Sequence, residues 1–130
     1  MTRKKAIRKF ASGATRNTSD DKLDFEGFLS PAVLIRFAEY MHKHRTQADG
    51  QIRDSDNWQK GIPRSAYMKS KMRHTIDMWA MHRGIQRYDR DDGHPYSLQE
   101  LCCADAFNTM GYLLELIRSG EGNTPLNDTQ

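Results

Sequence analysis

The chain has 130 residues, of which 37% are hydrophobic and 28% are charged, and its formal net charge is +3. These values are typical of a single soluble domain with a core of its own. No apolar run approaches the roughly 20 residues that cross a bilayer, and no apolar segment of a secretory signal follows the basic N-terminus. The sequence therefore predicts a cytoplasmic protein with no membrane partner.

Residues 1–29 are predicted to form a basic and polar N-terminal arm, because they show no helical or strand period. Five of the 20 basic residues lie in the first nine positions, which hold no acid, so the rest of the chain has 15 bases against 17 acids. A basic arm can touch nucleic acid, but it is more often a solvated end. Because the remaining chain has no basic surplus, a nucleic-acid partner is not favoured.

Residues 30–118 form the predicted helical domain, and residues 119–130 a disordered tail. Apolar side chains recur with a helical period in three stretches, and no segment alternates for long enough to predict a strand. The predicted fold is therefore an all-α bundle of three principal helices with the second helix at its centre. The helices are expected at about 30–45, 64–83 and 97–118.

Start and stop signals support these bounds. Ser30 and Pro31 are typical of an N-cap and the first helical position. Gly84 is a natural end for the second helix. Ser97 and Glu100 have the spacing of a capping box, which predicts the start of the third helix.

Two faces of the second predicted helix differ in chemistry. One face carries three apolar side chains, Met72, Ile76 and Trp79. The other face carries His74 and Asp77, three residues apart. We expect both faces to be covered, as in the central helix of a bundle. The polar pair then has a structural role, as a His–Asp contact or as a pair of Asp77 with Arg73, or it faces a ligand.

The third predicted helix has a stripe of polar and small residues, with Asp105 beside it. The stripe comprises Glu100, Ala104, Asn108, Gly111 and Glu115. Glu100 has a structural alternative, in which it folds back onto the Ser97 amide. Acids on two neighbouring helices can also hold a divalent cation, which prefers oxygen ligands. The adjacent Cys102 and Cys103 are expected to be buried, reduced thiols, because neighbours on a helix cannot easily form a disulfide.

Two loop segments suggest binding of an anion or a nucleotide. In "NWQKGIP", Trp58 offers a stacking surface and Lys60 a positive charge for phosphate. In "SGATR", Arg16 follows a glycine and a threonine, a composition that suits an anion. The sequence contains no P-loop, no Rossmann fingerprint and no nucleophile with a neighbouring base, which excludes the commonest phosphate and acyl-transfer motifs.

Four segments occur in a distinctive order: "DKLDFEGFLSPAVLIRFAEYMHKHR", "DNWQKGIP", "MRHTIDMWAMHRG" and "ELCCADAFNTMGYLLEL". In this order the chain resembles the phage family of the dATP/dGTP diphosphohydrolase N-terminal domain, which is related to the MazG-like all-α nucleotide pyrophosphohydrolases. The resemblance covers about residues 12–118.

The resemblance implies hydrolysis of purine deoxynucleoside triphosphates to monophosphate and pyrophosphate with Mg²⁺ or Mn²⁺, in a homo-oligomer located in the host cytoplasm. Its catalytic residues would be His74 and Asp77, and its metal ligands Asp77, Glu100 and Asp105. Its nucleotide-binding residues would be Arg16, Lys22, Asp24, Asn57, Trp58, Lys60, Arg73 and Asn108.

The chain departs from the MazG-like pattern at both acidic pairs. Where that pattern has Glu-x-x-Glu, this chain has His74 and Asp77, and the second pair is stretched to Glu100 and Asp105. An alternative function is therefore that of a non-catalytic phage protein that binds or sequesters a nucleotide or a nucleotide-derived signalling molecule. Such a protein needs contacts to base and phosphate but no charged metal site.

Overall fold

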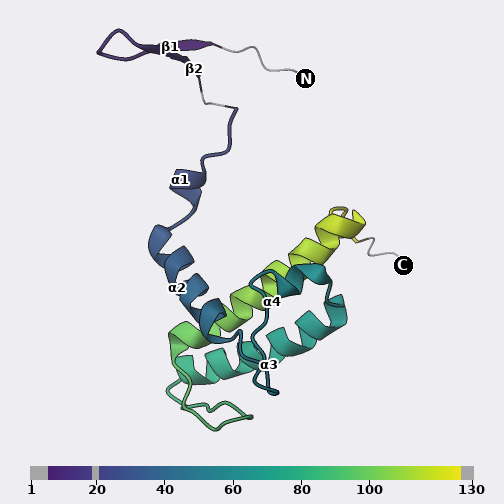
Figure 1. Ribbon diagram of the computed structural model, residues 1–130. Coiled ribbons are helices and arrows are strands. Elements are labelled where there is room, and N and C mark those ends of the chain that lie inside the picture. The colour runs from purple at the N-terminus through teal and green to yellow at the C-terminus, as the bar shows by residue number, and fades with distance from the viewer. Residues whose placement is uncertain (1–5, 19–20, 127–130) are drawn as a thin grey trace. The chain divides into compact units, whose positions relative to one another are not determined.

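The computed structural model describes residues 6–18 and 21–126, and its contacts divide the chain into two units, 1–34 and 35–130 (Figure 1). The part of the chain outside these described residues includes most of the basic N-terminus and the end of the predicted tail. The elements are β1 (Ile7–Lys9), β2 (Thr15–Asn17), α1 (Phe25–Phe28), α2 (Pro31–Lys43), η1 (Asn57–Lys60), α3 (Arg64–His82) and α4 (Leu98–Ser119).

The first unit contains an antiparallel hairpin of β1 and β2, so the prediction of a fold without strands is wrong here. Gly13 lies in the connecting turn with φ of +92°, a conformation that glycine adopts without steric cost. Each strand has only three residues, and all of them are exposed. Because neither strand has a buried face, their sequences do not alternate between polar and apolar residues, and the hydrophobic pattern could not predict the hairpin.

The three long helices confirm the predicted helical fold and lie close to the predicted bounds. At the start of α4, the Ser97 hydroxyl accepts from the Glu100 amide at 3.1 Å and the Glu100 carboxylate accepts from the Ser97 amide at 3.3 Å. This is the predicted capping box. Gly120 ends α4 in the left-handed conformation, with φ of +71°.

Packing of α3 against α4 forms most of the core of the second unit. Tyr67 of α3 lies against Gly111 of α4, where an added Cβ would overlap the tyrosine ring. Leu101, Cys103 and Ala104 complete the buried apolar group among the described residues. The small residues of α4 therefore admit the side chains of α3.

The apolar face of α3 is exposed, so the expectation that both faces are covered is wrong for the chain by itself. Met72, Ile76 and Trp79 keep 51%, 48% and 58% of their surface exposed, whereas Asp77 is fully buried. The polar face of α3 therefore lies inward. The expectation of two buried thiols is also corrected, because Cys103 is buried but Cys102 is exposed, although both are free.

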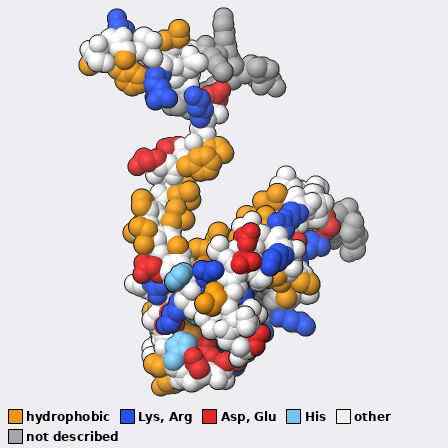
Figure 2. All heavy atoms as spheres, in the orientation of Figure 1, with side chains coloured by type: hydrophobic (Ala, Val, Ile, Leu, Met, Phe, Trp, Pro, Cys, Tyr) orange, Lys and Arg blue, Asp and Glu red, His pale blue; other side chains and the backbone are white. Residues whose placement is uncertain are grey.

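Hydrophobic side chains are also exposed along α2, where Val33, Leu34 and Ile35 are each at least 48% accessible (Figure 2). None of the described helices has the length and apolar content that crossing a membrane requires.

Candidate functional site

A cavity of about 750 Å³ lies within the second unit. Its walls come from the last turns of α2, the loop of residues 44–55, η1, α3 and α4. The volume is within the range of small-molecule sites, roughly 300–1,000 Å³. Four of the residues predicted for nucleotide binding or catalysis line this cavity: Asn57, Trp58, His74 and Asn108.

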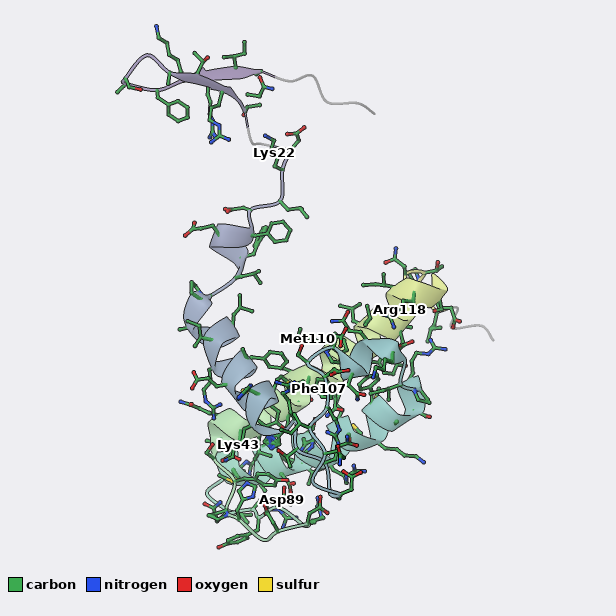
Figure 3. All side chains as sticks on the ribbon, viewed as in Figure 1. Lys22, Lys43, Asp89, Phe107, Met110 and Arg118 are labelled. Atoms are coloured by element: carbon green, nitrogen blue, oxygen red, sulfur yellow. The ribbon has the colours of Figure 1, made fainter. Side chains whose placement is uncertain are left out.

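Aromatic rings form one part of the wall. Trp58 of η1 meets Phe107 of α4 edge to face, with ring centroids 6.0 Å apart. Phe107 is labelled on α4 in Figure 3. Phe107 in turn meets Tyr67 at 5.9 Å, again nearly perpendicular. Such a chain of edge-to-face contacts holds the indole in place and leaves it on the wall of the cavity, where a planar ligand can stack on it.

Two polar side chains in the wall have unused hydrogen-bonding atoms. The Asn108 amide nitrogen donates to the Ala104 carbonyl at 3.0 Å, which leaves its Oδ1 without a donor among the described residues. His74 Nδ1 is buried and also lacks a partner there. Burial lowers the pKa of His74, although the nearby Asp77 carboxylate opposes that shift. A neutral imidazole and a free amide oxygen therefore face or border the cavity, and both suit a neutral polar ligand group.

Two arginines that the sequence analysis missed also line the cavity, Arg45 and Arg53. Arg45 Nε donates to the Arg53 carbonyl at 2.7 Å, and the Arg53 amide donates back to the Arg45 carbonyl at 2.8 Å. An antiparallel bridge of Thr46 with Ile52 closes the turn between them. The Asp49-Gly50 pair between two arginines was the available signal, because such a pair favours a tight turn that brings its flanks together.

The first predicted metal ligand, Asp77, pairs with the loop that follows α3. Arg87 Nε donates to its Oδ1 at 2.8 Å, and Arg90 Nη1 lies 3.6 Å from its Oδ2. This ion pair replaces the structural alternatives of a His74 contact or an Arg73 pair. Asp77 Oδ2 accepts no hydrogen bond within the described parts of the chain.

The other two predicted metal ligands also have protein partners. Asp105 accepts from Lys71 Nζ at 2.5 Å and from the Thr75 hydroxyl at 2.8 Å, which joins α4 to α3. Glu100 accepts from His94 Nε2 at 3.1 Å in addition to its capping-box bond. Within residues 6–18 and 21–126, Asp77, Glu100 and Asp105 do not bring their carboxylate oxygens to within 4.8 Å of one another as a three-residue metal site would.

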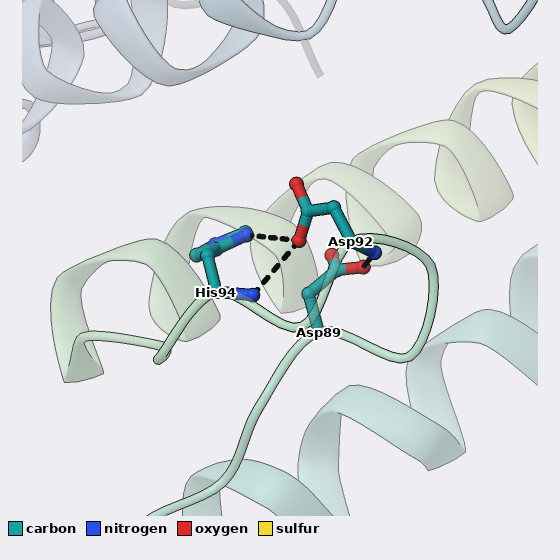
Figure 4. A group of neighbouring side chains, drawn as sticks. All are labelled: Asp89, Asp92 and His94. Carbon is teal, nitrogen blue, oxygen red and sulfur yellow. Dashed lines mark hydrogen bonds and ion pairs between the residues drawn. The ribbon is translucent and has the colours of Figure 1, made fainter.

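A different group does converge within that distance, formed by Asp89, Asp92 and His94 in the loop before α4 (Figure 4). Its atoms already have partners within the loop. Asp89 Oδ1 accepts from the Asp91 and Asp92 amides at 2.7 and 3.2 Å. His94 Nδ1 donates to Asp92 Oδ1 at 2.7 Å. These bonds account for the cluster as a loop-stabilising arrangement.

The remaining predicted residues lie outside the cavity wall. Lys60 forms a 3.9 Å ion pair with Asp54, and both side chains are well exposed. Arg73 donates to the Ser70 hydroxyl at 3.0 Å. Arg16, Lys22 and Asp24 belong to the first unit, where Asp24 caps α1 by accepting from the Gly27 amide at 3.0 Å. The cavity therefore combines three of the five predicted nucleotide-binding residues of the second unit with two unpredicted arginines.

No protein-family model, curated protein or solved structure matches this chain.

Proposed function

We propose that the second unit binds a purine nucleotide in the cavity between α2, η1, α3 and α4. One observation carries the proposal: Asn57, Trp58, His74 and Asn108, which come from three separate segments of the sequence, line the same cavity. The resemblance to the dATP/dGTP diphosphohydrolase N-terminal domain supports the same ligand class. It also supports a MazG-like bundle with α3 at its centre, completed by further copies of the chain.

Each of the four residues has a role that suits its surroundings. The Trp58 ring stacks on the base, because Phe107 fixes its orientation at the wall. The amides of Asn57 and Asn108 hydrogen-bond to the edge of the base, and Asn108 Oδ1 is available for this bond. His74 contributes a neutral imidazole next to the ligand, because burial lowers its pKa.

The described carboxylates do not fit the Mg²⁺ or Mn²⁺ that the resemblance implies. Oxygen ligands for these cations must converge, whereas Asp77, Glu100 and Asp105 are each engaged by basic or polar side chains. We therefore place binding or sequestration before hydrolysis. Hydrolysis of dATP or dGTP is the second candidate, and the observation that favours it is the buried Asp77 Oδ2, which has no hydrogen-bond donor among the described residues.

The implied homo-oligomer has a candidate surface on α3. Met72, Ile76 and Trp79 form an exposed apolar stripe at helical spacing, which a second copy of the chain would cover. Covering this stripe would place α3 inside a larger bundle, as the sequence analysis expected of a helix with apolar side chains on one face and polar side chains on the other.

The test uses the two tryptophans of the chain as a matched pair. Purified protein is incubated with a panel of deoxynucleoside triphosphates and cyclic nucleotides, first with Mg²⁺ and then with EDTA, and the products are separated by chromatography. Calorimetry then measures affinity for the wild type, for Trp58→Ala and for Trp79→Ala, whose indole lies on α3 and not in the cavity wall.

We expect intact purine nucleotide to bind and Trp58→Ala to weaken binding by about tenfold or more, because base stacking contributes roughly 1–3 kcal/mol. Trp79→Ala retains the affinity per chain. Monophosphate and pyrophosphate formed only with metal would establish the hydrolase instead. Absence of binding by every nucleotide in the panel would contradict both functions.

A further inference from the structure

We propose that Arg45 and Arg53 form a phosphate-binding pair, and that this pair binds a phosphate monoester or diester without a metal ion. The inference rests on the proposed function, because it assigns the anionic part of the same ligand. The ligand class is a nucleotide whose phosphate group carries one or two negative charges. The two binding residues are ones that the sequence pattern did not indicate.

Both arginines line the cavity and are anchored to the backbone of the loop of residues 44–55. Each arginine uses part of its fork on the loop backbone: Arg45 Nε donates to the Arg53 carbonyl at 2.7 Å, and Arg53 Nη1 donates to the His44 carbonyl at 3.3 Å. The other N–H groups of both forks have no acceptor among the described residues. A guanidinium anchored through one edge is preorganised to bind a phosphate through another.

Arg45 and Arg53 bring two positive charges to the cavity wall. Neither arginine forms an ion pair with a carboxylate in the described residues. His44 adds no charge near neutral pH, because burial and Lys43 lower its pKa. Asp54 is the carboxylate of the cavity wall, and it lies 3.9 Å from Lys60. Two like charges on a short turn repel each other, and a bound anion would relieve that repulsion.

The balance of charges indicates the class of phosphate. Two guanidinium groups match the one or two negative charges of a phosphate ester. A triphosphate carries more charge and is commonly bound with Mg²⁺ held by carboxylates. The carboxylates predicted for that purpose, Asp77, Glu100 and Asp105, do not line the cavity. The cavity thus has two guanidinium groups for a phosphate ester, and its wall holds the single carboxylate of Asp54 and not the predicted acids for a metal-bound triphosphate.

The experiment measures binding of four probes in EDTA and in Mg²⁺ by calorimetry: deoxyadenosine, its 5′-monophosphate, its 5′-triphosphate and inorganic phosphate. The variants are Arg45→Gln and Arg53→Gln, with Arg45→Lys and Arg53→Lys to retain the charge if a glutamine disturbs the loop. Lys43→Gln is the matched control, because it removes a positive charge next to the loop but does not line the cavity. Thermal unfolding of every variant checks the fold.

We expect the monophosphate to bind in EDTA with an affinity that Mg²⁺ does not change. Each glutamine variant should lose about tenfold or more of this affinity, while deoxyadenosine binding and the Lys43→Gln variant remain unchanged. The lysine variants should show intermediate losses, because a lysine lacks the planar fork.

Other results separate this inference from the proposed function. Nucleotide binding that requires Mg²⁺, or that survives both glutamine substitutions in folded protein, overturns the phosphate pair and leaves nucleotide binding intact. Binding of inorganic phosphate that both substitutions abolish, without binding of the nucleoside or its phosphates, supports the pair and contradicts the nucleotide function. Absence of binding by all four probes overturns both.

Discussion

The two faces of α3 differ in a way that reverses the usual relation between polarity and burial. On the inner face, Asp77 is buried and pairs with Arg87, and Lys71 and Thr75 bond to Asp105 of α4. On the outer face, the side chains of Met72, Ile76 and Trp79 are about half exposed. Polar contacts therefore join α3 to α4 and to the following loop beside the packing of Tyr67, and the three apolar side chains of the outer face remain exposed.

This comparison explains why the charged residues of α3 and α4 are better understood as structural than as metal ligands. A buried carboxylate needs a partner because an unpaired buried charge costs several kcal/mol. Asp77 and Asp105 have such partners within the chain. By contrast, Arg45 and Arg53 line the cavity without a carboxylate partner in the described residues. Partnered charges stabilise the fold, and unpartnered charges are available to a ligand.

The largest expected effect comes from Asp77→Asn, which removes the buried carboxylate from the inner face of α3. Asparagine removes the charge that Arg87 and Arg90 neutralise, while the buried position allows little relaxation. We expect a loss of about 2 kcal/mol in the free energy of unfolding, below the roughly 3–5 kcal/mol of fully buried pairs because both arginines are partly exposed. Urea unfolding monitored by circular dichroism measures this loss.

Asp54→Asn is the matched control, because Asp54 lies in an exposed ion pair with Lys60. Its unfolding free energy should change by less than about 0.5 kcal/mol. An Asp77→Asn protein with wild-type stability but without metal-dependent turnover would contradict the structural role. That outcome would return Asp77 to the metal-binding role that the resemblance implies.

The second prediction concerns the exposed apolar stripe on the outer face of α3. Ile76→Lys places a charge in the centre of the apolar stripe, and Trp79→Ala removes its largest side chain. If a second copy covers this stripe, both variants should shift the chain from oligomer to monomer at micromolar concentration, because truncation of a central aromatic residue costs about 2 kcal/mol or more at an interface. Light scattering coupled to size-exclusion chromatography measures the mass.

Ile52→Lys provides the comparison for this experiment, because Ile52 is an exposed apolar residue of the loop and not of α3. It should leave the mass unchanged. A wild-type chain that remains monomeric at high concentration would show that the stripe has no homotypic partner.

The sequence predicted the helices well and the contacts between them poorly. Helix ends depend on local signals, such as the Ser97 capping box and the Gly120 end of α4, which a linear pattern contains. The partner of Asp77 depends instead on how the loop of residues 85–97 folds back onto α3. Trp58, His74 and Asn108 stood out in the sequence pattern and Asn57 through the resemblance, whereas Arg45 and Arg53 were missed because their role depends on a turn and on the lack of an ion-pair partner among the described residues.

The smallest expected effect is a pH dependence at the loop that carries Arg87 and Arg90. His94 donates from both ring nitrogens, to Asp92 at 2.7 Å and to Glu100 at 3.1 Å. These two carboxylates raise the pKa of His94 above its usual value. Because the folded state binds this proton more tightly than the unfolded state, the bond between loop and α4 is stabilising below about pH 6.5. That contribution is lost as the pH rises through the raised pKa of the folded protein.

His94→Gln removes this titration but keeps a side chain that can hydrogen-bond to a carboxylate. His74 and His44 shift in the opposite direction, because burial lowers their pKa values, so the wild-type profile alone mixes opposing contributions. The informative quantity is the difference in unfolding free energy between wild type and His94→Gln across pH 5–9. We expect the advantage of the wild type to be greatest at the acidic end and to decline above about pH 6.5. A difference that is flat over this range would show that His94 does not couple the loop to α4 through its charge, and that Arg87 and Arg90 hold the loop on α3 without it.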